Sequence, residues 1–220
     1  MKDQRIRNAI LLRYYRRYLN DCSTPQFIAS VAQRYSLGTL ERLSENGELH
    51  TKRAAGLALG LLGDERCIGV LGPLLTASDR KLRLVVDDAM RAISAREGSP
   101  SQRQTLELVV RSNECGTFEK SVELASEIID SEGGTAELYH QRSLAFFQID
   151  SVEHAIADCQ QVLERNSFHY GAMIGLGHCH LEMGDLLESL TWLRGALAIF
   201  PDLEPVRVQV RRLERAIQEL

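Results

Sequence analysis

Residues 136–169 read AELYHQRSLAFFQIDSVEHAIADCQQVLERNSFH, and residues 170–203 read YGAMIGLGHCHLEMGDLLESLTWLRGALAIFPDL. The second segment repeats the first at a period of 34 residues, so that Leu163 falls on Leu197. Apolar residues recur at helical spacing inside each segment. A fixed period with helical spacing predicts stacked units, each of which needs a neighbour to cover its apolar face.

A third, degenerate copy precedes these two. Thr117, Ser151 and Asp185 lie one period apart, and each suits the N-cap of the second helix of a unit. Turn formers precede these caps, and small residues follow them where two helices must approach closely: Gly116, Asp150 and Gly184, then Ser121, Ala155 and Ser189. The pattern predicts three repeats and a terminal capping helix, at 102–135, 136–169, 170–203 and 204–220.

This organisation resembles the tetratricopeptide repeat, a unit of two antiparallel helices. The resemblance implies that the first helix of each unit lines a concave groove through fixed positions. At those positions the chain has an apolar stripe rimmed by two histidines, formed by Leu106, Val110, Leu144, Phe147, Ile174 and Leu181 with His140 and His178. We expect such a groove to bind an amphipathic helix or an extended apolar segment of a protein partner.

The other groove positions bear on which partner fits. Family members that clamp the C-terminal carboxylate of chaperones use Lys, Asn and Arg at several of these positions. None of these residue types stands at the clamp positions here, and the remaining positions include Glu107, Glu137 and Glu182. The resemblance therefore disfavours a carboxylate ligand. A groove filled by the N-terminal half of the chain itself stays open as an alternative.

The first half has a looser period. Residues 52–55 (KRAA) recur 30 positions later as residues 82–85 (LRLV), and a helix stop and turn, LGLLGD at 59–64, lies between them. This pattern resembles the short class of HEAT-like repeats, which implies stacked helix pairs used mostly in protein contact. Some members of that family are bilin lyases or their subunits, and a few process alkylated DNA. We predict a HEAT-like helical repeat domain over 1–96, ended by the Gly and Pro of residues 97–101.

Two features of this half have a structural interpretation. Gly56 and Gly60 form a GxxxG spacing, which we interpret as close helix contact inside a stack. Asp87 and Asp88 are successive residues that point about 100° apart on a helix, so they cannot act together on one atom. We expect both aspartates to be solvated.

Residues 5–19 predict a basic amphipathic helix, with a stripe of Ile6, Ile10, Leu11, Tyr14, Tyr18 and Leu19. Such a helix can dock on nucleic acid or an anionic membrane. We favour a terminal repeat helix with arginines in solvent, because the formal net charge of the chain is -4. Residues 1–100 have 16 Lys and Arg against 11 Asp and Glu, whereas residues 101–220 have 10 against 19. Self-association of the basic helix with the acidic half is a further alternative.

Cysteine usage and hydropathy indicate the compartment. Five cysteines are scattered at mostly apolar positions, as expected of buried thiols in a reducing environment. No apolar run approaches the ~20 residues that cross a bilayer, and no secretory signal is visible. We expect a cytoplasmic protein without a membrane span.

No pattern of catalytic or metal-ligating residues stands out. His178, Cys179 and His180 are adjacent, but successive helical residues diverge by about 100°, so the histidines do not share a face. We expect no catalytic residue, cofactor, metal or small-molecule substrate. The sequence predicts an all-α solenoid of antiparallel helix pairs, a non-enzymatic scaffold or adaptor for protein partners. The alternative function is a HEAT-repeat enzyme or enzyme subunit, similar to bilin lyases or DNA-binding members.

Overall fold

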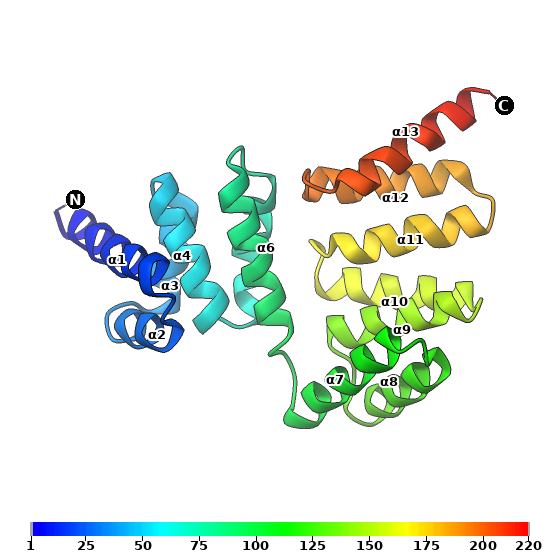
Figure 1. Cartoon of the computed structure of the whole chain (residues 1–220), viewed down its shortest axis with the longest axis horizontal. Helices are drawn as coiled ribbons and strands as arrows, with labels where there is room; N and C mark the ends of the chain where they lie inside the picture. Colours follow the sequence, from blue (N-terminus) through cyan, green and yellow to red (C-terminus); the bar gives the residue numbers. More distant parts are fainter. Residues whose placement is uncertain (1, 220) are drawn as a thin grey trace. The chain divides into compact units, whose positions relative to one another are not determined.

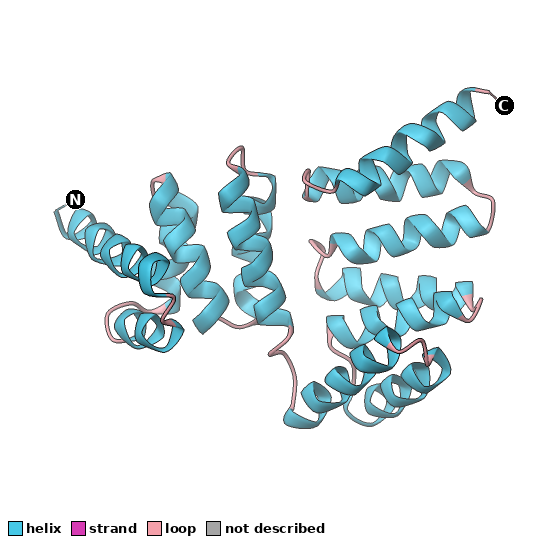
Figure 2. Cartoon of the chain, in the orientation of Figure 1, coloured by secondary structure: helices cyan, strands magenta, loops and turns pink. Residues whose placement is uncertain are grey.

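The chain is helical throughout its described part. The computed structural model describes residues 2–219, and no strand occurs among them (Figure 2). Contacts between residues divide the chain into two compact units, Met1–Arg96 and Glu97–Leu220. Within each unit, neighbouring helices pack against one another in pairs, as expected of an all-α solenoid. Each unit is described by itself.

The second unit is a stack of helix pairs followed by a last helix (Figure 1). Helices α7 to α13 span Pro100–Glu114, Phe118–Glu132, Ala136–Gln148, Val152–Arg165, Tyr170–Glu182, Leu186–Ile199 and Glu204–Gln218. Helix α7 packs on α8, α9 on α10 and α11 on α12, and each pair also contacts the next. The first helices of successive pairs, α7, α9 and α11, contact one another in order.

The turn inside each pair has the conformation that its residues suit. Gly116, Asp150 and Gly184 have positive φ angles of 71°, 58° and 80°. Glycine enters this left-handed region without strain, and aspartate does so more readily than most other residues. The chain therefore reverses direction at the positions that the repeat pattern indicated.

The second helices of the three pairs all begin with a residue type that suits an N-cap, but these residues do not all form the capping hydrogen bond. Thr117, Ser151 and Asp185 all hold the N-cap position, but only the Asp185 carboxylate accepts a capping hydrogen bond, from the Glu188 amide at 3.1 Å. The Thr117 hydroxyl donates to the Ser112 carbonyl instead, at 3.1 Å. The N-cap position thus recurs in all three pairs, whereas the capping contact does not.

The start of α7 differs from the sequence expectation. The sequence predicts a boundary over residues 96–101 and a repeat that starts near 102, whereas α7 already begins at Pro100. Ser99 and Gln102 form a capping box: the Gln102 amide donates to Ser99 Oγ at 3.1 Å, and the Ser99 amide donates to Gln102 Oε1 at 2.8 Å. Proline is well suited to the first position of a helix, so a residue type that usually ends helices begins this one.

The first unit is less regular. Its helices are α1 Lys2–Asp21, α2 Thr24–Ala32, α3 Leu37–Asn46, α4 Leu49–Leu62, α5 Ile68–Leu71 and α6 Arg80–Ser94, with 3-10 helices at Glu65–Cys67 and Gly72–Thr76. The segment from Glu65 to Thr76 divides into three short helices. The last begins at Gly72 and Pro73, since proline lacks the backbone donor that would continue α5. The HEAT-like identity of this unit stays a prediction.

Helices α4 and α6 approach closely at a glycine. A Cβ atom on Gly60 would lie 2.6 Å from the Ala89 Cα of α6, closer than real Cβ contacts allow. Gly56 has no such constraint, since its nearest neighbour would be a Val85 methyl at 3.5 Å. Only the second glycine of the GxxxG spacing is therefore required by helix contact.

Two details of this unit differ from expectation. Asp87 is buried and accepts a hydrogen bond from Arg91 Nε at 3.1 Å, whereas Asp88 is exposed. In α1, Leu11 and Tyr15 are buried while Leu19 is 58% exposed, because the core contact lies on the Leu11 side of the helix. The side chain of Ile6 lies outside the described residues. No described helix combines the length and apolarity needed to span a membrane.

Candidate functional site

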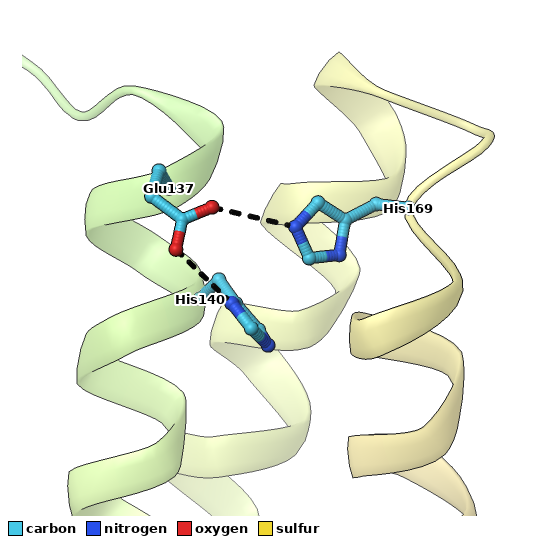
Figure 3. Close-up of side chains that lie close together, drawn as sticks. All are labelled: Glu137, His140 and His169. Atoms are coloured by element: carbon cyan, nitrogen blue, oxygen red, sulfur yellow. Dashed lines mark hydrogen bonds and ion pairs between the residues drawn. The ribbon is translucent and has the colours of Figure 1, made fainter. Parts of the chain in front are cut away.

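Three polar side chains converge where the second and third helix pairs meet (Figure 3). Glu137 and His140 lie one turn apart on α9, and His169 is the N-cap residue of α11. Glu137 Oε1 lies 3.4 Å from His140 Nδ1, and Glu137 Oε2 lies 3.6 Å from His169 Nε2. We call Glu137, His140 and His169 the Glu-His-His cluster.

The cluster is mostly shielded from solvent but not closed off. The side chains of Glu137, His140 and His169 are 23%, 17% and 14% exposed. Burial opposes the ionisation of Glu137, but hydrogen bonds with both histidines outweigh it and hold the pKa of this carboxyl far below its usual range. Burial lowers the pKa of His169, and its hydrogen bond to Glu137 only partly opposes this. The cluster therefore pairs an ionised carboxylate with a neutral imidazole at His169.

Backbone and side-chain contacts orient the cluster. His169 Nδ1 accepts a hydrogen bond from the Ala172 amide at 3.0 Å, so the proton of the neutral ring lies on Nε2, facing Glu137. Gln141 Nε2 donates to Glu137 Oε1 at 2.8 Å. Asn113 of α7 donates in turn to Gln141 Oε1 at 3.0 Å. A chain of polar contacts thus holds the carboxylate in place in addition to the two histidines.

The predicted groove residues divide by their exposure. Leu106 differs from the expectation, because it is only 8% exposed and packs in a core cluster with Ile128 and Leu138. Val110 is partly buried against the same cluster, and Ile174 packs against the apolar core between α12 and α13. These three side chains stabilise the unit and offer little surface. The periodic pattern could not distinguish these buried positions from exposed ones, since buried and exposed residues lie on the same helices.

The other groove residues present surface on neighbouring helices. Leu144 and Leu181 are each 40% exposed, on α9 and α11. Phe147 and His178 lie on the same two helices, and their ring centroids are 6.4 Å apart. His178 Nε2 lies 3.3 Å from Gln209 Oε1 of α13. We call Leu144, Phe147, His178 and Leu181 the apolar patch.

Sequence reasoning missed two polar groupings. It placed Glu137 and His140 among groove positions but did not connect them with His169, which lies about one repeat further along the chain. It also missed the contact of Arg142 with Asp158, whose carboxylate oxygens lie 2.8 Å from Arg142 Nε and Nη2. The signal for the first was a Glu and a His at i and i+3, which share a helix face.

The neighbours of His178 have separate surroundings. Cys179 is buried, and burial raises the pKa of its thiol to about 11. His180 Nδ1 lies 3.9 Å from Asp185 Oδ2, whereas His178 contacts α13. The side chains of His178, Cys179 and His180 therefore contact different parts of the unit.

Comparisons with known proteins bear on the fold. No family model and no curated protein matches the chain. The first tetratricopeptide domain of Spaghetti (RPAP3), solved with an HSP90 peptide, superposes with a TM-score of 0.52 at 16% identity, covering 55% of this chain and 96% of that one. TTC0263, a tetratricopeptide protein of Thermus thermophilus, gives a TM-score of 0.41 at 18% identity, covering 94% and 98%. The first likeness and the stacked helix pairs show that this chain contains a tetratricopeptide-repeat fold.

Proposed function

We propose that the protein is a helical-repeat scaffold that binds a protein partner on the apolar patch of Leu144, Phe147, His178 and Leu181. The supporting observation is that two leucines on adjacent first helices are each 40% exposed. Large apolar side chains that stay in contact with water on neighbouring elements are typical of docking surfaces. The partner segment is an amphipathic helix or an extended apolar strand, which would bury these side chains.

The charge of the surroundings restricts the partner. The RPAP3 domain was solved with the acidic HSP90 peptide SRMEEVD. In this chain the equivalent first helices contribute Glu107 and Glu182 at exposed positions, together with the ionised Glu137. An acidic peptide would be repelled at such a surface. We therefore propose an apolar partner segment with neutral or basic flanks, and a role in assembly without chemistry on the partner.

Affinity capture with matched variants tests this proposal. Leu144→Glu and Phe147→Glu place a charge inside the patch, and we expect each to remove the captured partner while helical content stays unchanged. Leu187→Glu is the control, because Leu187 is 65% exposed but lies on α12, a second helix of its pair. Captured proteins are quantified by mass spectrometry, and helical content is followed by circular dichroism.

The comparison of variants decides the outcome. Loss with Leu144→Glu and Phe147→Glu but not with Leu187→Glu supports docking on the patch. Equal capture by all three variants excludes the patch as the binding surface. The peptide SRMEEVD serves as a defined ligand in the same assay, and tight binding of that peptide would contradict the proposed preference for an apolar segment.

A further inference from the structure

We propose that Glu137, His140 and His169 form a binding site for a divalent transition-metal ion, for which zinc is the best fit. The three side chains come from two elements of the second unit, α9 and the N-cap of α11. Each offers one ligand atom, and these atoms all lie within 4.8 Å of one another. Figure 3 shows the carboxylate beside the two imidazole rings, with one oxygen directed at each ring.

The spacing of the ligand atoms suits a small metal ion. Zinc bonds to histidine nitrogen and carboxylate oxygen are about 2.0–2.2 Å long, which places tetrahedral ligand atoms roughly 3.3 Å apart. His140 Nδ1 lies 3.4 Å from Glu137 Oε1, and His169 Nε2 lies 3.6 Å from Glu137 Oε2. One ion can therefore be held by the two nitrogens and the carboxylate after small side-chain rotations, since one ligand atom from each residue already lies within 4.8 Å of the others.

The ligand types point to the class of metal. Two imidazoles and one carboxylate are nitrogen and oxygen ligands that suit zinc and ferrous iron, whereas calcium and magnesium require mainly oxygen. Three protein ligands leave one tetrahedral position for water. Because each side chain is partly exposed, an ion can reach the cluster from solvent.

A contact from outside the cluster already holds the carboxylate in place. Gln141, held by Asn113, donates to Glu137 Oε1 and fixes the carboxylate from outside the cluster. Such outer contacts commonly orient metal ligands.

Three contacts change when the ion binds: metal bonds replace the contacts of Glu137 with the two histidines, and His169 loses the capping hydrogen bond at Nδ1. The proton on His169 Nε2 moves to Nδ1, or leaves to solvent as Nδ1 takes one up, so Nδ1 no longer accepts from the Ala172 amide. The Ala172 amide also lies 3.1 Å from the His169 carbonyl, which stays available as its acceptor. His140 binds through Nδ1, the atom that lies against Glu137 Oε1, so the proton on Nδ1 leaves to solvent as Nε2 takes one up. The free energy lost with this capping hydrogen bond is small compared with the free energy of binding a transition metal to three ligands.

The competing account is a hydrogen-bonded link between repeats that binds no ion. A zinc titration by calorimetry distinguishes the two, carried out on the full chain with Cys22→Ser and Cys115→Ser, since these two exposed thiols would bind zinc themselves. We expect one zinc ion per chain. Glu137→Gln and His140→Ala should each weaken binding by roughly tenfold or more.

The control and a second readout keep the test independent of folding. His154→Ala removes an exposed histidine of α10 outside the cluster and should leave the affinity unchanged. At one fixed zinc concentration, the metal should raise the melting temperature of the parent chain more than that of Glu137→Gln, because an ion that binds only the folded state stabilises it in proportion to its occupancy. Cobalt should give visible d–d absorption bands that His140→Ala weakens.

Specific results would overturn the site. Absence of binding at about 100 µM zinc by the folded parent chain would leave the cluster as a hydrogen-bonded link. Affinity unchanged in Glu137→Gln and His140→Ala would place the zinc elsewhere. Both results leave the apolar patch untested, so failure here is separate from failure of the proposed partner binding.

Discussion

Each unit has an arginine–aspartate ion pair that links two of its helices, but the two pairs differ in how far they are buried. In the second unit Arg142 of α9 binds Asp158 of α10 through two 2.8 Å contacts, and their side chains are 14% and 6% exposed. Arg142 Nη1 also donates to Ser126 Oγ of α8 at 2.9 Å. In the first unit Arg53 of α4 binds Asp79 at 3.0 Å and 2.6 Å, but Asp79 is 24% exposed.

The position of each aspartate explains the difference. Asp79 is the N-cap of α6 and accepts from the Leu82 amide at 2.7 Å, so it keeps a partner at the helix end even without Arg53. Asp158 lies inside α10, where Arg142 donates to both of its carboxylate oxygens. A buried carboxylate that loses its cation is far more costly than one at a solvated helix end. The comparison predicts unequal consequences for the same substitution.

The largest effect is expected for Arg142→Met. This change leaves the Asp158 carboxylate buried without its cation, and we expect the free energy of unfolding to fall by about 4 kcal/mol. Denaturant unfolding followed by circular dichroism measures the loss. Arg53→Met is the matched variant, and its effect on the first unit should be clearly smaller.

A double substitution sharpens this result. Arg142→Met with Asp158→Leu removes both charges and should recover most of the lost stability, because no uncompensated charge remains. If Arg53→Met is as destabilising as Arg142→Met, then the contribution of these ion pairs to stability does not depend on how far the aspartate is buried.

The units also differ in how they allow close helix contact. The first unit uses Gly60, against which Ala89 leaves no room for a side chain. The second unit uses Ser121, Ala155 and Ser189, which are 0%, 1% and 0% exposed. We expect Gly60→Val to destabilise the first unit by about 3 kcal/mol through overpacking. Hydrogen exchange should localise the loss to α4 and α6.

Gly69→Val is the control for that substitution. Gly69 lies in α5, and a Cβ atom there would meet no atom within 4 Å, so only the small helix-propensity change applies. Equal destabilisation by Gly60→Val and Gly69→Val would show that close contact is not the reason for the glycine at 60.

The smallest effect is expected at Ser189. Its hydroxyl is fully buried and has no hydrogen-bond partner among the described residues. Ser189→Ala removes an unsatisfied polar group without changing the packing, so unfolding should become more costly by up to about 1 kcal/mol. Ser121→Ala is the comparison variant. Ser121 Oγ lies 3.5 Å from the Val109 carbonyl, so removing this hydroxyl should raise the free energy of unfolding by less. A loss of stability in Ser189→Ala would contradict this interpretation.

The sequence predicted the second unit better than the first. The period of 34 residues in the sequence anticipated turns at Gly116, Asp150 and Gly184, because left-handed turn positions have a narrow choice of residues. The first unit has fewer such markers, and its segment from Glu65 to Thr76 divides into three short helices, the last of which begins at Gly72 and Pro73. Helix α7 starts at Pro100, slightly before the repeat predicted from 102, because proline also suits the first position of a helix.

Helix periodicity predicted which candidate site residues share a face of one helix, but not which of them are exposed. Spacing along one helix put Glu137 and His140 on the same face, with Leu144 one turn and Phe147 two turns further on. It could not show that Leu106 packs in the core while Leu144 stays 40% exposed, since that depends on what the neighbouring helices contribute. Exposure on a repeat face is set by contacts between units of the stack.

The sequence by itself determined the helices, the repeat length and the turns of the second unit, since these depend on local spacing and on residues that fit particular backbone angles. Only the tertiary structure brought His169 to Glu137, because stacking carries the N-cap of α11 against α9 from about one repeat away in the chain. It also decided the pairing of Arg142 with Asp158. Contacts between helices depend on how the helices pack, which one-dimensional periodicity does not specify.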